Sequence, residues 1–314
     1  MIKQIPAPTV DVIFPPNTNH HYFEDFASHP FRHDANGFEL VNAWWLAESS
    51  LLAYANSEFV RDQFDRAGLR LAGPQPLSGP STQCYIAHND NFVIVAFRGT
   101  QVLKPGAGQD LRKALKEVVS DILTDANFKL VDSGTAGSIH LGFKEALAEV
   151  SRELSAILNE LKTENAARTV WFTGHSLGAA LATLAAQSYD AVKGLYTFGS
   201  PRVGDKIFAA DFDVNAFRFV NGRDIVTRVP PRFLPGPYKH VGQVKHIDRS
   251  HIVRDQLPRK TRLIDNVRRN YFQLFGRRAA SATKITDGIP GNDLIDHTPL
   301  YYALHIWNHY FASK

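Results

Sequence analysis

Cysteine is almost absent from this chain. Cys84 is the only one among 314 residues, so no disulfide can form within the chain and the fold has to be stabilised by its core alone. Cys84 lies in an alternating segment, residues 83–87, which is typical of a strand. We therefore expect a buried structural thiol there rather than a catalytic nucleophile.

Long apolar runs and leader-like segments are missing as well. No stretch of about 18 apolar residues occurs, which argues against a transmembrane helix. Residues 1–16 contain one lysine with no apolar run behind it, unlike a secretory signal. Together with the single cysteine, these absences favour a cytoplasmic location or an export route that does not use a signal peptide.

Excess charge is also missing over most of the chain. The net charge is +4, but residues 254–284 contain nine basic residues and two aspartates, a local charge of +7. The remainder therefore carries −3, which argues against nucleic-acid binding by a broadly basic surface. Within the basic segment, residues 261–275 have the periodicity of an amphipathic helix. Such a helix fits either contact with an anionic membrane or ordinary packing with a solvated arginine face.

What the chain does contain is a strand-to-helix turn. Residues 169–173 are β-branched and aromatic, as in a buried strand, and residues 179–187 are mostly small helix formers. Between them stands Gly-His-Ser-Leu-Gly, in which the serine is Ser176. Strand, G-x-S-x-G and helix form the nucleophile elbow of α/β-hydrolases, where glycines allow a tight turn that presents the serine hydroxyl. An ordinary glycine-rich turn is the alternative.

Hydrophobic patterns predict strands and helices on both sides of this turn. Two strands joined by the polar turn Asn-Asp-Asn are expected at 83–88 and 92–97. Further strands are expected at 193–198 and 216–220, and helices at 42–67, 143–161 and 301–311. This order predicts an α/β-hydrolase fold with a mostly parallel central sheet and helices on both faces.

The candidate acid lies after Ser176. A serine becomes a good nucleophile only with a base and an acid, which in this fold follow in the order Ser, Asp, His. Asp224 comes just after the expected strand at 216–220, where open α/β sheets carry their sites. A turn or capping aspartate is the alternative for this residue. The weaker candidates for the acid are Asp211, Asp213 and Asp255.

The candidate base is harder to select, because six histidines follow Asp224. They are His240, His246, His251, His297, His305 and His309. His305 and His309 lie four residues apart in a helix-like run and would share one face as packing or surface residues. His297 lies in a loop that leads into this run, which is where the base belongs.

Two segments are candidates for the oxyanion hole. One donor is expected from the backbone N–H of Leu177, the residue after the nucleophile. The second is expected in Phe-Arg-Gly-Thr, which ends the strand at 92–97 and continues beyond it. There Thr100 offers both its N–H and its hydroxyl.

With these motifs, the chain resembles the class 3 lipases, the fungal-lipase-like α/β-hydrolases, from about residue 40 to 232 and near 297–302. The resemblance is carried by Val-Ala-Phe-Arg-Gly-Thr at 95–100, by the elbow and by Phe-Gly-Ser-Pro-Arg-Val-Gly at 198–204. Further similar blocks lie at 43–54, 140–143 and 224–231. It implies roles for five residues. They are Ser176 as nucleophile, Asp224 as acid, His297 as base, and Thr100 and Leu177 in the oxyanion hole.

The resemblance also implies a lid after the oxyanion strand, and residues 101–121 occupy that position. Pro-Gly-Ala-Gly at 105–108 fits a hinge, and Asp110 fits the N-cap of a helix that ends near Leu123. Such a lid would cover an apolar cleft in water and expose it at a lipid surface. A surface helix without a gating role is the alternative. The expected organisation is one domain over residues 1–314, with an irregular lead-in at 1–36 and a basic insertion at 254–290.

Taken together, these features predict a serine carboxylic-ester hydrolase that cleaves acyl lipids through an acyl-enzyme, without a metal or cofactor. Two alternatives stay within the enzyme class, a phospholipase A1-like enzyme and a short-chain or feruloyl esterase. A third is a lipid-binding protein that kept the fold and lost turnover. The expected partner is a lipid ester, with contact to a lipid interface through residues 101–121 and 254–284.

Overall fold

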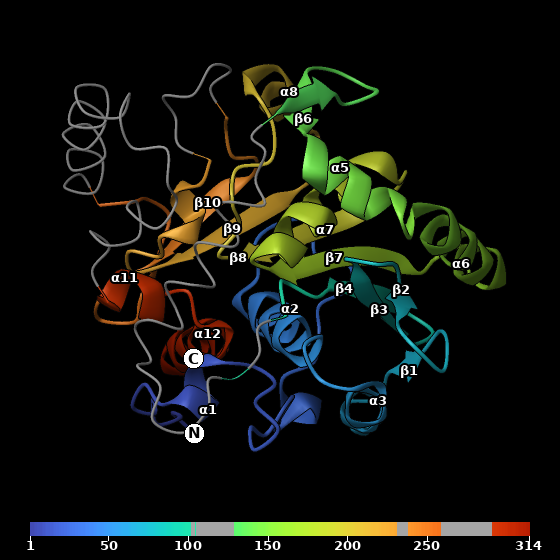
Figure 1. Ribbon diagram of the computed structural model, residues 1–314. Coiled ribbons are helices and arrows are strands. Elements are labelled where there is room, and N and C mark those ends of the chain that lie inside the picture. Colours follow the sequence, from blue (N-terminus) through green and yellow to red (C-terminus); the bar gives the residue numbers. More distant parts are fainter. Residues whose placement is uncertain (102–103, 105–128, 231–237, 259–290) are drawn as a thin grey trace, which may run out of the picture.

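The computed structural model describes residues 1–101, 104, 129–230, 238–258 and 291–314. Within them lies a nine-stranded sheet with the strand order β1-β3-β4-β7-β8-β9-β10-β11, and β2 pairs with β3 (Figure 1). The four pairs from β4 to β10 are parallel, and the pairs toward either edge are antiparallel. The strands are β1 Arg70–Leu71, β2 Leu77–Ser78, β3 Gln83–His88, β4 Phe92–Phe97, β7 Thr169–His175, β8 Val192–Phe198, β9 Ala216–Asn221, β10 Gln243–Ile247 and β11 Val253–Arg254.

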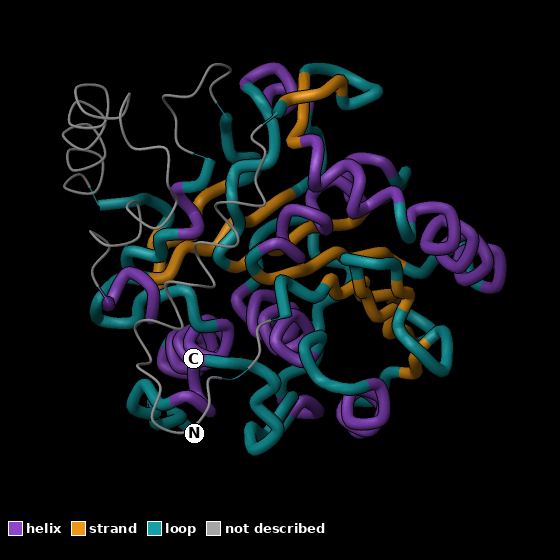
Figure 2. Tube along the Cα trace, viewed as in Figure 1, coloured by secondary structure: helices purple, strands orange, loops and turns teal. Residues whose placement is uncertain are grey.

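Helices cover both faces of this sheet, as Figure 2 shows. On one face α2 (Leu40–Leu52) and α12 (Pro299–Ala312) pack against each other, and the other face carries α5 (Leu141–Ala148), α6 (Ser151–Glu164) and α7 (Leu177–Ser188). The expected α/β-hydrolase fold with a mostly parallel sheet is therefore confirmed. The shorter elements are α1 Val10–Ile13, η1 Phe26–Ser28, α3 Ser57–Arg66, β5 Leu130–Asp132, β6 Ser138–His140, α8 Lys206–Asp211, η2 Val226–Arg228 and α11 Gly291–Ile295.

The central strands explain why the sheet could be predicted. All six residues of β4 are buried, as are all but the first residue of β7. Parallel strands covered by helices on both faces bury both sets of side chains, so they have nearly continuous apolar sequences. The free thiol of Cys84, on β3, is also buried, which confirms its structural interpretation, and burial raises its pKa.

Two expected helices are each divided. The pattern at 42–67 forms α2 and α3, because the side chain of Asn56 accepts a hydrogen bond from Phe59 N–H and starts a new helix. The pattern at 143–161 forms α5 and α6. The break follows Glu149, whose carboxylate accepts hydrogen bonds from Ser81 and Thr82 in the loop between β2 and β3. The prediction of one continuous helix at each place is therefore wrong.

Several predictions concern segments that the structure does not describe. The lid helix expected at 110–123, most of the lid region 101–121 and the basic amphipathic helix expected at 261–275 lie outside the described residues. In the described part of the chain, no helix is both long and apolar enough to cross a bilayer. The two chain ends lie close together (Figure 1), and Lys3 N–H donates a hydrogen bond to the side chain of Asn308 on α12.

Candidate active site

The predicted site residues follow four neighbouring parallel strands. Thr100 follows β4, Ser176 follows β7 and Asp224 follows β9, while Gly199 directly follows β8. Because the carboxyl ends of parallel strands lie at one edge of a sheet, these residues gather at the same edge. His297 comes from the segment between α11 and α12, which reaches this edge from the C-terminal end of the chain.

Ser176 occupies a strained turn between β7 and α7. Its φ is 58° and its ψ is −127°, a conformation that residues other than glycine rarely adopt. A methyl group at position 174 would meet the backbone of Gly178, and one at position 178 would lie 2.8 Å from the backbone of Arg98. Both glycines are therefore required by close backbone approach, as the elbow motif predicts. The Ser176 side chain is buried, and its hydroxyl has no hydrogen-bond partner among the described residues.

Asp224 and His297 form a buried hydrogen-bonded pair. His297 Nδ1 lies 2.8 Å from Asp224 Oδ2, although 73 residues separate them in sequence. Asp224 is 0% exposed, and its other oxygen accepts a hydrogen bond from Val226 N–H. Since a carboxylate only accepts, Nδ1 of His297 carries the proton, which leaves Nε2 with the lone pair that a general base needs. Asp224 therefore accepts a hydrogen bond within a turn, as the alternative interpretation expects, and also pairs with His297, as an acid would.

Tyr302 adds a further donor to this pair, and no role was predicted for this residue from the sequence. Its hydroxyl donates to Asp224 Oδ2 over 2.6 Å and accepts a hydrogen bond from Asn221 N–H. Burial, and next the charge of Asp224, raise the pKa of Tyr302, so the phenol keeps its proton. The neighbouring Tyr301 instead donates to the carbonyl oxygen of Pro6 in the N-terminal lead-in. A tyrosine one helical turn into α12 was the only sequence signal for this contact.

Gly199 explains why a glycine stands after β8. A methyl group there would lie 2.8 Å from both Asp224 Oδ2 and His297 Nδ1, and the φ of Gly199 is 61°. Ser176 N–H donates a hydrogen bond to the carbonyl oxygen of Phe198, the preceding residue. The Phe-Gly-Ser-Pro block therefore contacts the nucleophile turn through its backbone and leaves space for the acid–base pair.

Contacts between the segments that carry Asp224 and His297 fix their separation. Asp296 Oδ2 accepts a hydrogen bond from Arg223 N–H over 2.7 Å, and Asn221 donates to the Asp296 carbonyl oxygen. Asp293 is buried and lies 3.5 Å from the guanidinium of Arg223. Burial is the largest effect on Asp296 and raises its pKa to about 6. The hydrogen bond from Arg223 N–H lowers this pKa, and the charge of Asp224 raises it further.

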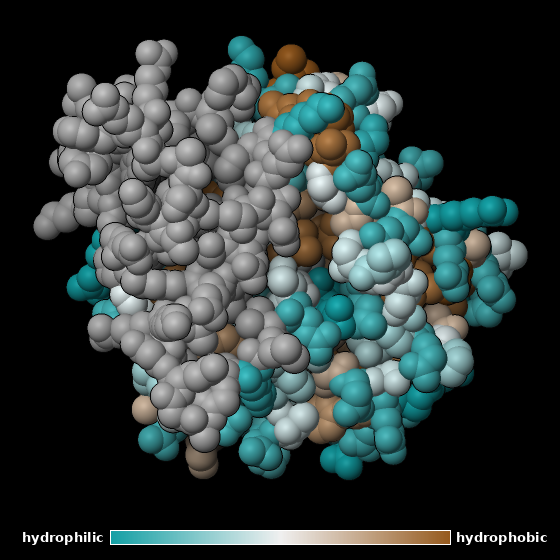
Figure 3. Space-filling view, viewed as in Figure 1, coloured by the Kyte–Doolittle hydropathy of each residue, from teal (hydrophilic) through white to brown (hydrophobic). Residues whose placement is uncertain are grey.

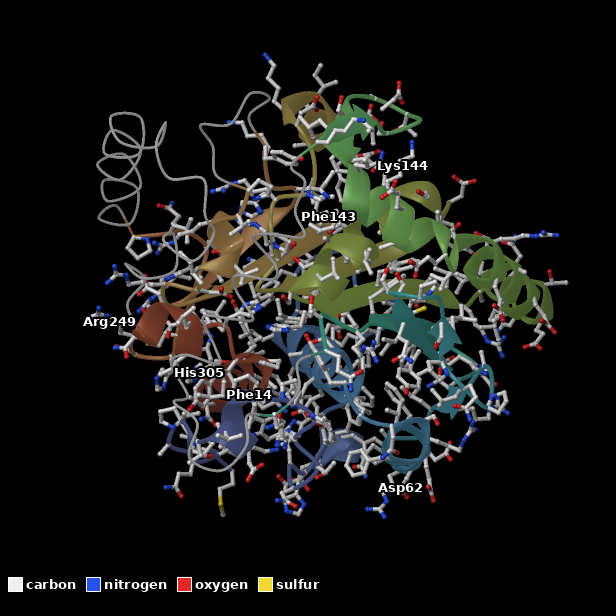
Figure 4. The ribbon with its side chains drawn as sticks, in the orientation of Figure 1. Phe14, Asp62, Phe143, Lys144, Arg249 and His305 are labelled. Carbon is white, nitrogen blue, oxygen red and sulfur yellow. The ribbon has the colours of Figure 1, made fainter. Side chains whose placement is uncertain are left out.

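The other histidines lie in different surroundings. His305, labelled in Figure 4, belongs to α12 and stacks on His251 with ring centroids 3.9 Å apart. His309 Nδ1 accepts a hydrogen bond from Val253 N–H, so both helical histidines serve in packing, as predicted. His240 and His246 donate to backbone carbonyl oxygens. Among these residues, only His297 contacts the Asp224 carboxylate.

The two oxyanion candidates lie on adjoining segments. Leu177 is the first residue of α7, where backbone N–H groups have no partner within the helix. Thr100 follows Arg98 and Gly99, and the close approach of Gly178 to the Phe97–Arg98 backbone brings this segment against the elbow. Their sites on the fold are compatible with the predicted oxyanion hole.

Comparisons with known proteins match the part of the chain that carries most of the site. The model of the family "Lipase (class 3)" matches residues 94–234. The secreted mono- and diacylglycerol lipase 1 of Fusarium solani is 29% identical over 211 residues, covering 62% of this chain and 62% of that protein. The secreted mono- and diacylglycerol lipase A of Penicillium cyclopium is 32% identical over 171 residues, covering 51% and 50% respectively. The chain thus spans less than two thirds of the length of these relatives.

Among solved structures, a triacylglycerol lipase described as having a serine protease triad superposes with a TM-score of 0.53. The match has 23% sequence identity and covers 68% of this chain and 82% of that one. At this identity the likeness concerns the fold, and it agrees with the sheet order and the helices on both faces described above.

These relatives correct the predicted location. The single cysteine and the lack of a signal-like segment favoured a cytoplasmic location or an export route without a signal peptide, but the Fusarium and Penicillium relatives are named secreted lipases. The expectation of a cytoplasmic location is therefore wrong, and the comparison points to export. A single cysteine was a poor guide, because a large apolar core stabilises a domain of this size without disulfides.

The family match includes the segments that define the site. Residues 94–234 contain the Phe-Arg-Gly-Thr segment, the elbow with Ser176, the glycine after β8 and the turn with Asp224. The sheet order and the fungal lipase fold agree with it. The central part of the chain, residues 94–234, therefore matches the class 3 lipase family, and the fold agrees with that of the lipase structure above.

Proposed function

We propose that this protein is a serine carboxylic-ester hydrolase that acts on acyl lipids, with Ser176, Asp224 and His297 as its catalytic residues. The observation that carries the proposal is the buried 2.8 Å contact between Asp224 and His297 at the edge of the sheet where the strained Ser176 turn lies. Residues 1–314 act as one domain in this proposal, since the segments that follow β4, β7 and β9 and the segment before α12 all contribute to one site.

In the first half of the reaction, Nε2 of His297 takes the Ser176 hydroxyl proton while Oγ attacks the ester carbonyl carbon. Asp224 stabilises the imidazolium that forms but keeps its negative charge. The tetrahedral intermediate then collapses, the bond to the alcohol oxygen breaks, and His297 returns the proton to that oxygen. The products are a free alcohol and an acyl group on Ser176.

In the second half, His297 takes a proton from water, and the hydroxyl attacks the acyl carbonyl. Collapse releases the fatty acid and returns the proton to Ser176. The backbone N–H groups of Leu177 and Thr100, with the Thr100 hydroxyl, stabilise the negative charge on the carbonyl oxygen in both halves. Removal of one such donor typically costs on the order of 3 kcal/mol of barrier.

The substrate class follows from the family and from the surface. The Fusarium and Penicillium relatives are named for mono- and diacylglycerols, and we propose acylglycerol esters for this chain as well. Apolar atoms gather in the upper part of the view in Figure 3, in the region of α8 and β6. Ile207 of α8 is 53% exposed, and an exposed patch of apolar residues in this region fits contact with lipid. Contact through residues 101–121 and 254–284 is proposed from their sequence alone.

A series of p-nitrophenyl esters of increasing acyl length tests this function. We expect hydrolysis to increase from acetyl to medium or long acyl chains and to vanish in Ser176→Ala. Activity confined to acetyl esters would favour a short-chain esterase, and release of the sn-1 fatty acid from phosphatidylcholine would favour a phospholipase A1. No Ser176-dependent hydrolysis of any ester would contradict the proposal and favour a lipid-binding protein.

A further inference from the structure

A buried chain of hydrogen bonds adjoins the acid–base pair, through two side chains that the mechanism above does not use. Tyr54 lies just after α2, and His175 is the last residue of β7. The Tyr54 hydroxyl lies 2.9 Å from His175 Nδ1, and His175 Nε2 lies 2.8 Å from the carbonyl oxygen of His297. The rings of His175 and His297 also contact each other, with centroids 4.4 Å apart.

The hydrogen bonds between Tyr54, His175 and His297 allow only one assignment of donors and acceptors. The His297 carbonyl oxygen can only accept, so Nε2 of His175 carries the proton and Nδ1 accepts from the Tyr54 hydroxyl. Burial, and next the nearby His297, lower the pKa of His175 well below its ordinary value. Burial raises the pKa of Tyr54, which keeps its phenol protonated. Both side chains therefore remain neutral, and the hydrogen-bonded arrangement stays the same across the physiological pH range.

The other end of the chain reaches the oxyanion segment. The Gly99 backbone lies against the Tyr54 hydroxyl so closely that a methyl group at position 99 would overlap that hydroxyl. Gly99 directly precedes Thr100, the proposed oxyanion donor. This contact and the two hydrogen bonds thus connect Gly99, Tyr54, His175 and the backbone of His297, which come from four separate parts of the sequence.

We propose that Tyr54 and His175 are positioning residues that hold the Gly99–Thr100 segment and His297 at a fixed separation across the elbow. The inference rests on the proposed function, because it assigns these segments to the oxyanion hole and the base. Nε2 of a base has to lie within about 3 Å of the hydroxyl that it deprotonates. A misplacement of about 1 Å can cost roughly 100-fold in rate. Two neutral hydrogen bonds that fix His297 through its backbone leave its side chain free to exchange protons.

Tyr54→Phe tests the inference, because it removes only the hydroxyl. We expect kcat for the soluble ester p-nitrophenyl butyrate to fall about 10- to 100-fold while KM changes less than about twofold. Tyr85→Phe is the matched control. Tyr85 on β3 is also buried, and its hydroxyl donates to the Ala55 carbonyl oxygen over 3.2 Å, one residue from Tyr54. It should lower the melting temperature by a similar amount but leave kcat within about twofold of wild type.

His175 offers a second pair of variants that separates positioning from packing. Gln at position 175 has an amide N–H that can donate to the His297 carbonyl oxygen, whereas Phe fills the space without donating. We expect His175→Gln to retain at least about fivefold more kcat than His175→Phe, at comparable folded fractions. A purely structural role predicts that kcat follows the folded fraction in all variants.

Equal kcat in Tyr54→Phe and Tyr85→Phe would overturn the inference, even if the His175 variants fail to fold. Ser176→Ala, measured in parallel, separates this result from failure of the proposed function. If wild type hydrolyses the ester and Ser176→Ala does not, the function stands and only the positioning role is lost. If wild type has no Ser176-dependent activity, the function and the inference fall together.

Discussion

The proposed acid, Asp224, and the proposed nucleophile, Ser176, are both buried, but their polar atoms have opposite surroundings. Asp224 accepts hydrogen bonds from His297, Tyr302 and the Val226 N–H. The Ser176 hydroxyl has no partner among the described residues, and its backbone has a positive φ. An unsatisfied buried hydroxyl and a strained backbone each cost about 1–3 kcal/mol. The site thus stabilises the group that must keep its charge and destabilises the group that must react.

Removal of the nucleophile has the largest expected effect on activity. Ser176→Ala should lower ester hydrolysis by at least about 10⁴-fold, because no covalent intermediate can form. It should leave the melting temperature equal or slightly higher, since alanine removes an unsatisfied hydroxyl. Kinetics on p-nitrophenyl butyrate and thermal unfolding measure the two effects. A clear fall in melting temperature would contradict the contrast between Ser176 and Asp224, because it would mean that the Ser176 hydroxyl is hydrogen-bonded in the folded protein.

Removal of the acid's charge should cost about as much in rate but act oppositely on stability. Asp224→Asn should reduce kcat by roughly 10⁴-fold, because an amide no longer holds the required tautomer of His297. The amide nitrogen of the new side chain cannot accept a hydrogen bond, so at least one group that now donates to the carboxylate would lose its acceptor. The melting temperature should therefore fall. The same two assays apply. An active Asp224→Asn enzyme would contradict the assignment of the acid.

Loss of one donor to Asp224 should have a smaller effect. Tyr302→Phe should lower kcat about 10-fold, since a hydrogen bond to a charged group is worth about 1.5–3 kcal/mol. Tyr301→Phe is its control, because that hydroxyl donates to the Pro6 carbonyl oxygen and not to the acid. Steady-state kinetics of the two variants should differ clearly. Equal kcat values would show that Asp224 is held well enough by its other two donors.

The smallest effect on rate is expected at Asp296, next to His297, because this carboxyl group acts on stability. Its folded-state pKa of about 6 lies above the ordinary value, so the folded protein binds the proton more tightly than the unfolded chain. The carboxyl group therefore contributes most stability below about pH 4 and loses it as the pH rises to about 6. Asp296→Asn stays neutral and still accepts from Arg223 N–H. It should exceed wild type in stability by about 3 kcal/mol at pH 8, because a shift of about two pKa units is worth about 1.4 kcal/mol per unit, and by much less at pH 4.

Urea unfolding at the two pH values measures this difference. Asp213→Asn, at an exposed position, provides a control that should change nothing at either pH. Wild type and Asp296→Asn with equal stabilities at pH 8 would show that burial of the Asp296 carboxylate is fully compensated by its surroundings.

Sequence patterns predicted the fold wherever structure depends on local sequence. The apolar runs of β4 and β7, the turn between β3 and β4, and the small residues of α7 each identify one element. Ser176 and Asp224 could be proposed as site residues because they follow predicted strands at fixed positions. The expected helix across Glu149 was wrong because the chain is divided where the Thr82 hydroxyl donates to the Ala146 carbonyl oxygen of α5, a contact from far away in sequence.

The supporting residues of the site could not be predicted for the same reason. Tyr302 contacts Asp224 across 78 positions, and His175 contacts Tyr54 across 121 positions. No local pattern marks a tyrosine that donates to the carboxylate of a proposed acid, because its helix has the same apolar character as a helix that only packs. The glycine after β8 could be seen in the sequence, but its purpose depends on Asp224 and His297, which approach it only in the folded chain.

The central claim is that Ser176 reacts because His297 and Asp224 activate it. Labelling with a fluorophosphonate, followed by intact-mass analysis and peptide mapping, tests this claim most directly. The account predicts one adduct per chain, on Ser176, and labelling at least about 100-fold slower in His297→Ala, because no base then takes the hydroxyl proton. An adduct on another residue, or equal labelling rates in wild type and His297→Ala, would contradict it.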